Sequence, residues 1–177
     1  MNFLRPAGGF VSFGRLSLTT LDCHRQVGAT SNEAGGMLLG RFINQTQDIV
    51  VDEATAPTGE DSPGRFFFNR AKGAAQRYID LAWGESSSTR VYLGEWHTHP
   101  EDVPIPSDHD LRNWRRITKR AQYHQDSLIF VIVGRQKIRA WICAKSTLAV
   151  SELEIVFQGR RDGAIYHFDI PDRQGEP

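Results

Sequence analysis

The segment GEWHTHPEDVPIPSDHD, residues 94–110, contains the features that decide the fold of this chain. The residues that lead into it predict a strand over residues 90–99, and strand alternation places the imidazoles of His97 and His99 on one face. Three prolines between residues 100 and 106 exclude regular structure from the stretch that follows. The segment therefore predicts a strand that ends in a stiff, irregular loop.

A helix is expected after this loop, over residues 107–123. Ser107 and Asp110 match the Ser-x-x-Asp pattern of a capping box, in which the serine caps the helix and the acidic side chain reaches back. The same carboxylate could turn toward the histidine pair. Two imidazoles and one carboxylate would leave a tetrahedral zinc ion with one open position, as catalytic zinc sites have. Surface histidines and an ordinary helix cap explain each feature better when it is taken alone. Joined by the proline-rich loop, the features favour a metal site at His97, His99 and Asp110, mainly because together they resemble a known family pattern.

The remainder of the chain mixes apolar strands and amphipathic helices without a strict βαβ order or an internal repeat. This pattern predicts an α/β or α+β domain with a mixed sheet. Helices are expected over residues 16–27 and 69–83, the second with Asn69 as its N-cap. Their apolar faces comprise Leu16, Leu18, Leu21 and Cys23 in the first helix, and Ala71, Ala74, Ala75, Tyr78, Leu81 and Ala82 in the second. Strands are expected over residues 10–15, 37–39, 48–54, 128–133 and 138–144. The last two are expected to form a hairpin around Gly134. Weaker strands are expected over 153–157 and 164–168, and a loop over 56–64.

The composition is that of an ordinary folded domain. The chain has 177 residues and a mass of 20.0 kDa, with 40% hydrophobic and 24% charged residues and 21 basic against 21 acidic side chains. This length fits one domain, and the balanced charge gives no general reason to expect nucleic acid or an anionic membrane as a partner. No apolar run is long enough to span a membrane, and residues 1–10 lack the apolar core of a secretory signal. Cys23 and Cys143 form no CxxC pair, so buried thiols in a reducing cytoplasm are expected instead of disulfides or a thiolate zinc site.

Charge is nevertheless unevenly distributed around residues 94–110. Residues 95–110 contain five acidic residues and no lysine or arginine, whereas residues 112–120 contain five basic residues and no acidic one. The basic residues form a stripe along the predicted helix, opposite its apolar side. A solvated outer face explains the stripe most simply, and a docking surface for an acidic protein is the alternative. The stripe comprises Arg112, Arg115, Arg116, Lys119 and Arg120.

A hydrolytic zinc site also requires a general acid and base. Glu95 is the nearby candidate, since alternation places it on the strand face of His97. Glu33 is the distant candidate, just before a glycine-rich apolar run that would allow close approach of the backbone to a ligand. A solvated residue before a strand is the simpler interpretation of Glu33, and spacing alone does not choose between the two glutamates.

The pattern resembles the signature of the JAMM (MPN-plus) metalloprotease family: an early glutamate, then His-x-His, seven residues, a serine, two residues and an aspartate. The run His97-Thr98-His99, the seven residues 100–106, Ser107 and Asp110 reproduce it, including the proline after the second histidine. Upstream, EAGGMLLG at residues 33–40 resembles the strand of the family that carries the catalytic glutamate. The resemblance covers roughly residues 10–145 and is far more specific than an isolated His-x-His.

The resemblance implies both a fold and a set of roles. It implies a single JAMM/MPN domain over residues 1–168, with a mixed curved sheet flanked by helices in a cytidine-deaminase-like architecture, followed by a polar tail over 169–177. It further implies that His97, His99 and Asp110 bind Zn²⁺, that Glu33 moves the proton of the attacking water, that Ser107 stabilises the oxyanion, and that Glu95 is structural.

The resemblance also implies a substrate class. Family members hydrolyse isopeptide or peptide bonds after the C-terminal residue of ubiquitin or ubiquitin-like proteins, so a protein with an extended C-terminal tail is expected. The short connection between the predicted helix 107–123 and the strand at Leu128 lacks the second insertion of larger eukaryotic members. In compactness the chain is similar to small bacterial members, including the deconjugating peptidase of CBASS antiphage defence, whose substrate is a conjugated cGAS/DncV-like nucleotidyltransferase.

Other functions are compatible with parts of the pattern. The chain could act on a ubiquitin-like or sulfur-carrier protein, as other bacterial members do. It could also be a non-catalytic MPN-type scaffold, although a scaffold has no reason to keep an open metal site. A two-histidine, one-carboxylate iron oxygenase is the third alternative, but its ligand order and spacing usually differ.

Overall fold

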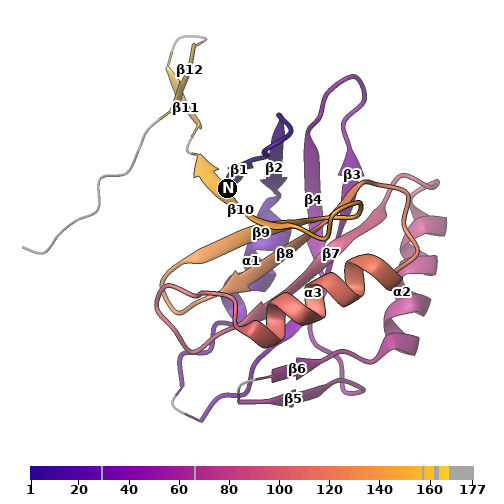
Figure 1. The fold of residues 1–177 in the computed structure, drawn as a ribbon, viewed down its shortest axis with the longest axis vertical. Coiled ribbons are helices and arrows are strands. Elements are labelled where there is room, and N and C mark those ends of the chain that lie inside the picture. The colour runs from indigo at the N-terminus through magenta and orange to yellow at the C-terminus, as the bar shows by residue number, and fades with distance from the viewer. Residues whose placement is uncertain (29, 66, 157, 162–163, 168–177) are drawn as a thin grey trace, which may run out of the picture.

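The computed structural model describes residues 1–28, 30–65, 67–156, 158–161 and 164–167. Within these residues, eight strands close into one mixed sheet (Figure 1). In spatial order they are β1 (Asn2–Leu4), β10 (Val150–Val156), β9 (Ile138–Ala144), β8 (Ser127–Val133), β7 (Val91–Thr98), β3 (Gly35–Phe42), β4 (Ile49–Ala54) and β2 (Phe10–Phe13). The helices are α1 (Arg15–Cys23), α2 (Lys72–Glu85) and α3 (Asp108–Arg120). The expected mixed curved sheet with flanking helices is therefore confirmed.

The mixed character of the sheet follows from its connections. Neighbours β8 and β9 form the expected antiparallel hairpin. Strands β7 and β8 run parallel because the loop after β7 and the helix α3 form a long crossover between them. Strands β2 and β4 form the other parallel pair. Strand β7, which carries the first histidine, pairs with β3 on one side and with β8 on the other, and most of its residues are buried.

Strand alternation divides the core into two clusters, one on each face of the sheet. Leu38, Trp96 and Val131 pack on one face together with Leu21 of α1. Met37, Leu39 and Phe130 pack on the other face, which is covered by α2 and α3. Because both faces of β8 are covered, the strand is apolar from Leu128 to Val133 and all six of these residues are buried.

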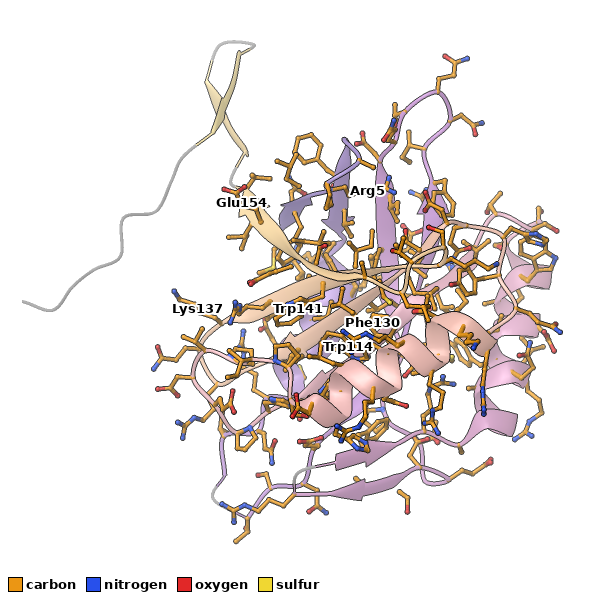
Figure 2. The ribbon with its side chains drawn as sticks, in the orientation of Figure 1. Arg5, Trp114, Phe130, Lys137, Trp141 and Glu154 are labelled. Atoms are coloured by element: carbon orange, nitrogen blue, oxygen red, sulfur yellow. The ribbon has the colours of Figure 1, made fainter. Side chains whose placement is uncertain are left out.

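Trp114 attaches α3 to the sheet. Its ring stacks on Phe130 of β8, with centroids 4.9 Å apart and planes 14° from parallel, and lies 5.5 Å from the ring of Trp141 on β9. Figure 2 shows these three side chains together beneath the helix. The contact fixes the orientation of α3, and therefore the direction of the residues in its first turn.

The structure corrects both expected early helices. The first ends at Cys23 and not at residue 27, because the buried side chain of Gln26 hydrogen-bonds away from the helix, to the carbonyls of Ser31 and Arg65. The second starts at Lys72, after Ala71 as N-cap. The expected N-cap Asn69 instead lies in a short strand of a hairpin, and the Asp61 carboxylate accepts the hydrogen bond from the Ala71 amide at 2.8 Å. This hairpin consists of β5 (Ser62–Gly64) and β6 (Phe67–Asn69). Strand β5 lies within the stretch 56–64 that was expected to be a loop.

The buried faces of these helices are narrower than expected. In α1, Leu21 is buried but Leu16 is 77% exposed, and Cys23 is exposed because it lies off the buried stripe of Ser17 and Leu21. The expectation of two buried cysteines is thus confirmed only for Cys143. In α2 the buried residues are Ala75 and Ala82, with Ile79 partly buried between them, while Tyr78 and Leu81 face solvent.

The C-terminal part adds two expected strands and one unexpected strand. Strand β10 covers the expected element at 153–157 as far as Val156, and β11 (Gln158–Arg161) pairs with β12 (Ala164–His167), which covers the element expected over 164–168. Residues 157 and 168 and the expected polar tail 169–177 lie outside the described residues, so the domain boundary at residue 168 stays a prediction. No helix in the described ranges has the length and apolar character needed to cross a membrane.

Gly94 is required where β7 passes β8. Its φ is +149°, and a Cβ atom there would lie 1.8 Å from the carbonyl oxygen of Ile129. We expect Gly94→Ala to lower the free energy of unfolding by about 3 kcal/mol through backbone strain and overpacking. Gly84 of α2 is the matched control, since a Cβ there meets nothing within 4 Å. Urea denaturation should show Gly84→Ala stabilised by about 0.5–1 kcal/mol; similar effects of the two substitutions would contradict this account.

Candidate metal centre and active site

His97, His99 and Asp110 converge at the end of β7. The Nε2 atoms of the two histidines are 3.1 Å apart. The Asp110 carboxylate lies 3.2 Å from His97 Nε2 through Oδ1 and 3.4 Å from His99 Nε2 through Oδ2. All three side chains are largely buried, with exposed fractions of 10 to 13%. The structure therefore brings together the three residues that the sequence predicted as metal ligands.

The separations of these atoms fit a tetrahedral metal ion. Zinc–nitrogen and zinc–oxygen bonds of about 2.0–2.1 Å place neighbouring ligand atoms about 3.3–3.4 Å apart. The observed separations are 3.1 Å between the two imidazole nitrogens, and 3.2 and 3.4 Å from these nitrogens to the Oδ1 and Oδ2 atoms of Asp110, respectively. Imidazole nitrogen and carboxylate oxygen are also donor types that zinc commonly uses. The donor set and its geometry thus suit zinc with three protein ligands.

Asp110 both caps the helix and faces the histidines. The Ser107 hydroxyl accepts a hydrogen bond from the Asp110 amide at 3.2 Å, and Asp110 Oδ2 accepts from the Ser107 amide at 2.7 Å. The hydroxyl also donates to Asp110 Oδ2 at 2.6 Å. One turn after Asp110, Trp114 holds the helix against the sheet, 6.3 Å from the ring of His97. The capping box and the ligand geometry therefore do not exclude each other, because the cap orients the carboxylate.

Electrostatic interactions in the cluster favour an ionised carboxylate. Burial opposes ionisation of Asp110, but hydrogen bonds from His97, His99 and Ser107 outweigh it and hold the pKa of this carboxyl well below its usual range. Burial also disfavours the charged form of His99, yet the nearby Asp110 and Glu33 raise the pKa of its imidazole. An ionised carboxylate is the form in which aspartate binds a metal ion.

Glu33 lies beside this cluster. Its side chain is buried, 5% exposed, which contradicts the simpler interpretation of a solvated residue. Burial raises the pKa of its carboxyl to about 8, while the charge of His99 lowers it and that of Asp110 raises it further. The backbone amide of Glu33 donates to the carbonyl of Gly64 at 2.8 Å, so the β5–β6 hairpin supports the segment. A buried carboxyl with a raised pKa is typical of general acids and bases.

Glu95 is occupied elsewhere. Its carboxylate forms an ion pair with Arg70 and accepts a hydrogen bond from the Tyr92 hydroxyl at 3.1 Å. Burial raises the pKa of Tyr92 well above its ordinary value, so the hydroxyl stays protonated and available as a donor. Glu33, the other glutamate that the sequence offered as a base, interacts electrostatically with His99 and Asp110.

Two residues that the sequence did not single out hold Glu33 in place. Thr98, between the histidines, is completely buried, and its hydroxyl accepts from the Ala34 amide at 2.9 Å. Gln26 donates to the carbonyls of Ser31 and Arg65, at 2.7 and 3.0 Å. Alternation alone indicates that Thr98 faces the side of the strand opposite the histidines. The partners of Gln26 are distant in sequence and depend on the tertiary fold.

We expect Thr98→Val to lower the free energy of unfolding by about 1–3 kcal/mol, because it leaves the Ala34 amide without its acceptor. Thr118 offers a matched control. It is also completely buried, but its hydroxyl oxygen has no hydrogen-bond partner among the described residues. Thr118→Val should therefore be neutral or stabilising in urea denaturation. Equal losses at the two positions would show that burial of the threonine, and not its hydrogen bond, determines the cost.

Comparison with known proteins adds information that geometry does not provide. The model of the family described as prokaryotic homologs of the JAB domain matches residues 23–144. A Pseudomonas aeruginosa protein named CD-NTase/cGAS isopeptidase is 36% identical over 71% of this chain and 78% of its own length. An Escherichia coli protein of the same name is 34% identical over 76% of this chain and 81% of its own length. A solution structure of a Desulfitobacterium hafniense protein superposes with a TM-score of 0.59 at 21% identity, covering 89% of this chain and 99% of the other, which shows similarity of fold.

Proposed function

This chain belongs to the family of prokaryotic homologues of the JAB domain, and from that membership we propose that it is a zinc-dependent isopeptidase. The observation that carries the proposal is the convergence of His97, His99 and Asp110 beside the buried carboxyl of Glu33. A non-catalytic scaffold would have no need for this complete set of side chains. The proposed reaction is hydrolysis of the amide bond that joins the C-terminus of one protein to an amine of another.

In this proposal His97, His99 and Asp110 hold the zinc ion. Bound zinc lowers the pKa of water to about 7 and polarises a carbonyl oxygen. Glu33 accepts the proton of the attacking water at its carboxylate and delivers it to the nitrogen of the leaving amine. Its buried position beside the cluster supports this role, because a carboxyl with a raised pKa retains the proton until it transfers it to the nitrogen of the amine as that group leaves. Thr98 and Gln26 position the segment that carries Glu33.

Ser107 is proposed to stabilise the oxyanion that forms on the scissile carbonyl. Its hydroxyl donates to Asp110 in the structure, and a hydroxyl can turn its proton toward another acceptor without moving its oxygen. The cap keeps this oxygen at the start of α3, beside the proposed metal ligand. Glu95 has a structural role in the proposal, through its ion pair with Arg70.

The substrate is proposed to be a nucleotidyltransferase of the CD-NTase type, conjugated through its C-terminal tail. The names of the Pseudomonas aeruginosa and Escherichia coli relatives support this class. The compact connection of residues 121–126 between α3 and β8 supports recognition of the conjugated tail without a large additional domain.

A defined conjugate tests the proposal. A CD-NTase joined through its C-terminal carboxyl to a lysine side chain of a reporter protein should be cleaved by the zinc-loaded enzyme into the two intact proteins. Electrophoresis would follow the release, and mass spectrometry would identify the unmodified C-terminus. A conjugate with a ubiquitin-like protein in place of the nucleotidyltransferase tests the alternative substrate. Persistence of both conjugates with an enzyme that contains zinc would refute the proposed activity.

A further inference from the structure

A cavity of about 250 Å³ lies between α2 and the C-terminal half of α3. Its charged lining consists of Arg70, Arg116, Arg120 and Glu95, so three positive charges stand against one negative charge. The remaining lining is uncharged and comprises Gln76, Ile79, Tyr92, Ile117, Ala121 and Gln122. The amide of Gln76 donates to Asp80 at 2.9 Å, one turn further along α2, and Asp80 does not line the cavity.

Arg116 and Arg120, the two arginines that α3 contributes to the cavity, have no carboxylate partner among the described residues. Arg116 donates to the side-chain oxygen of Asn113, at 2.5 Å, and both arginines are exposed. Some arginines elsewhere on the surface are paired with a carboxylate, as in Arg41–Asp52 at 2.8 Å and Arg135–Asp102 at 2.7 Å. The cavity therefore has a wall of uncompensated guanidinium groups.

The opposite wall contributes a further donor. Arg70 neutralises Glu95 through their ion pair, and Tyr92 donates to the same carboxylate oxygen. The Nε atom of Arg70 is buried and has no hydrogen-bond partner among the described residues. Because Glu95 is matched by Arg70, the net charge that the cavity presents comes from Arg116 and Arg120.

We propose that this cavity, the arginine pocket, binds acidic side chains of the protein substrate close to the scissile bond. The inference rests on the proposed isopeptidase function, because the pocket and the candidate metal centre share helix α3. Arg116 and Arg120 follow Asp110 by six and ten residues, which corresponds to about 9 and 15 Å along the helix axis. An extended chain covers these distances with about three to five residues.

The lining favours carboxylates of a protein over a nucleic acid. Planar guanidinium groups bind carboxylates in a bidentate manner, and the cavity has room for a few side chains. The cavity offers only the two uncompensated guanidinium groups of Arg116 and Arg120, fewer than the several phosphate contacts on which nucleic-acid binding depends. The chain as a whole carries equal numbers of acidic and basic residues, 21 each, so the positive charge is local.

Binding of a fluorescein-labelled hexaglutamate peptide, followed by anisotropy, tests the inference without any cleavage. The wild-type protein should bind hexaglutamate, and not hexaglutamine, with an affinity that falls between low and physiological salt. The double substitution Arg116→Glu/Arg120→Glu should weaken binding by at least about tenfold, since it replaces two attractive contacts by repulsive ones. Arg15→Glu/Lys137→Glu is the matched control: it makes the same change of charge at exposed positions outside the pocket and should leave binding within about twofold. Figure 2 shows Lys137 on the turn between β8 and β9, away from α2.

Equal binding of hexaglutamate by the two double variants would overturn the arginine pocket. Competition by a single-stranded oligonucleotide at lower concentration than hexaglutamate would overturn its specificity for carboxylates. Loss of binding in the pocket variant alone would support the inference, even if the defined conjugate were not cleaved. Cleavage of the conjugate with unchanged hexaglutamate binding in both variants would support the isopeptidase and refute the pocket.

Discussion

Replacement of Glu33 by glutamine is expected to reduce kcat for the defined conjugate by about a thousandfold, within the range that general acid and base catalysis contributes. The glutamine keeps the size of the side chain and can fill the same buried site, but it cannot accept the proton of the attacking water. Zinc content, measured by elemental analysis, should stay unchanged, because Glu33 is not among the three converging ligands. KM should change little, because the substitution alters a group that acts on the attacking water.

Glu95→Gln is the matched control for this experiment. Glu95 was the nearby candidate for the base, but its carboxylate is bound to Arg70 and Tyr92. The substitution should leave kcat within a few-fold of the wild type and should lower stability by about 1–3 kcal/mol, since Arg70 loses its partly buried partner. A Glu33→Gln variant with undiminished kcat, together with an inactive Glu95→Gln variant, would reverse the assignment of the base.

Removal of the Asp110 carboxylate is expected to abolish both metal binding and activity. Asp110→Ala should reduce zinc from about one ion per chain to a small fraction of that, and kcat by at least about a thousandfold. In the wild type, zinc at about a thousand times its dissociation constant should add about 4 kcal/mol to the free energy of unfolding. For a chain of this size that corresponds to a rise in Tm of roughly 10 °C, which the variant should lack.

Asp108→Ala provides the control in the same turn of α3. Asp108 is an exposed acidic residue of that turn and lies outside the histidine–aspartate cluster. Its removal should lower the free energy of unfolding by about 0.3–1 kcal/mol through the helix dipole and leave the zinc content intact.

Elemental analysis of the wild type also separates the proposed enzyme from the iron oxygenase. Iron in place of zinc at a stoichiometry near one would contradict the isopeptidase assignment.

Local patterns in the sequence were sufficient for much of this architecture. Alternation predicted that His97 and His99 share one face of their strand, because side-chain direction in a strand depends only on position along the chain. Short apolar runs around Gly134 predicted the buried strands at 128–133 and 138–144. The capping box at Ser107 was predicted for the same reason, since it is closed by residues three positions apart. The predicted boundaries of α1 and α2 were wrong because they depend on a hydrogen bond that Gln26 donates to the Arg65 carbonyl and on one that Asp61 accepts from the Ala71 amide, both with partners outside the helix pattern.

The sequence by itself determined the chemistry of the candidate centre: two imidazoles on one strand face, a carboxylate at a helix start, and two glutamates as possible bases. Only the tertiary structure shows how differently those glutamates are placed, because Glu33 is far from the histidines along the chain and is brought near them by the pairing of β3 with β7. The arginine pocket also depends on contacts between elements that are separate in the sequence. The basic stripe on α3 was visible as a periodic pattern, but its combination with Arg70 required α2 and α3 to lie side by side. Spacing along a strand or helix reports side-chain direction, whereas proximity between elements depends on how they pack.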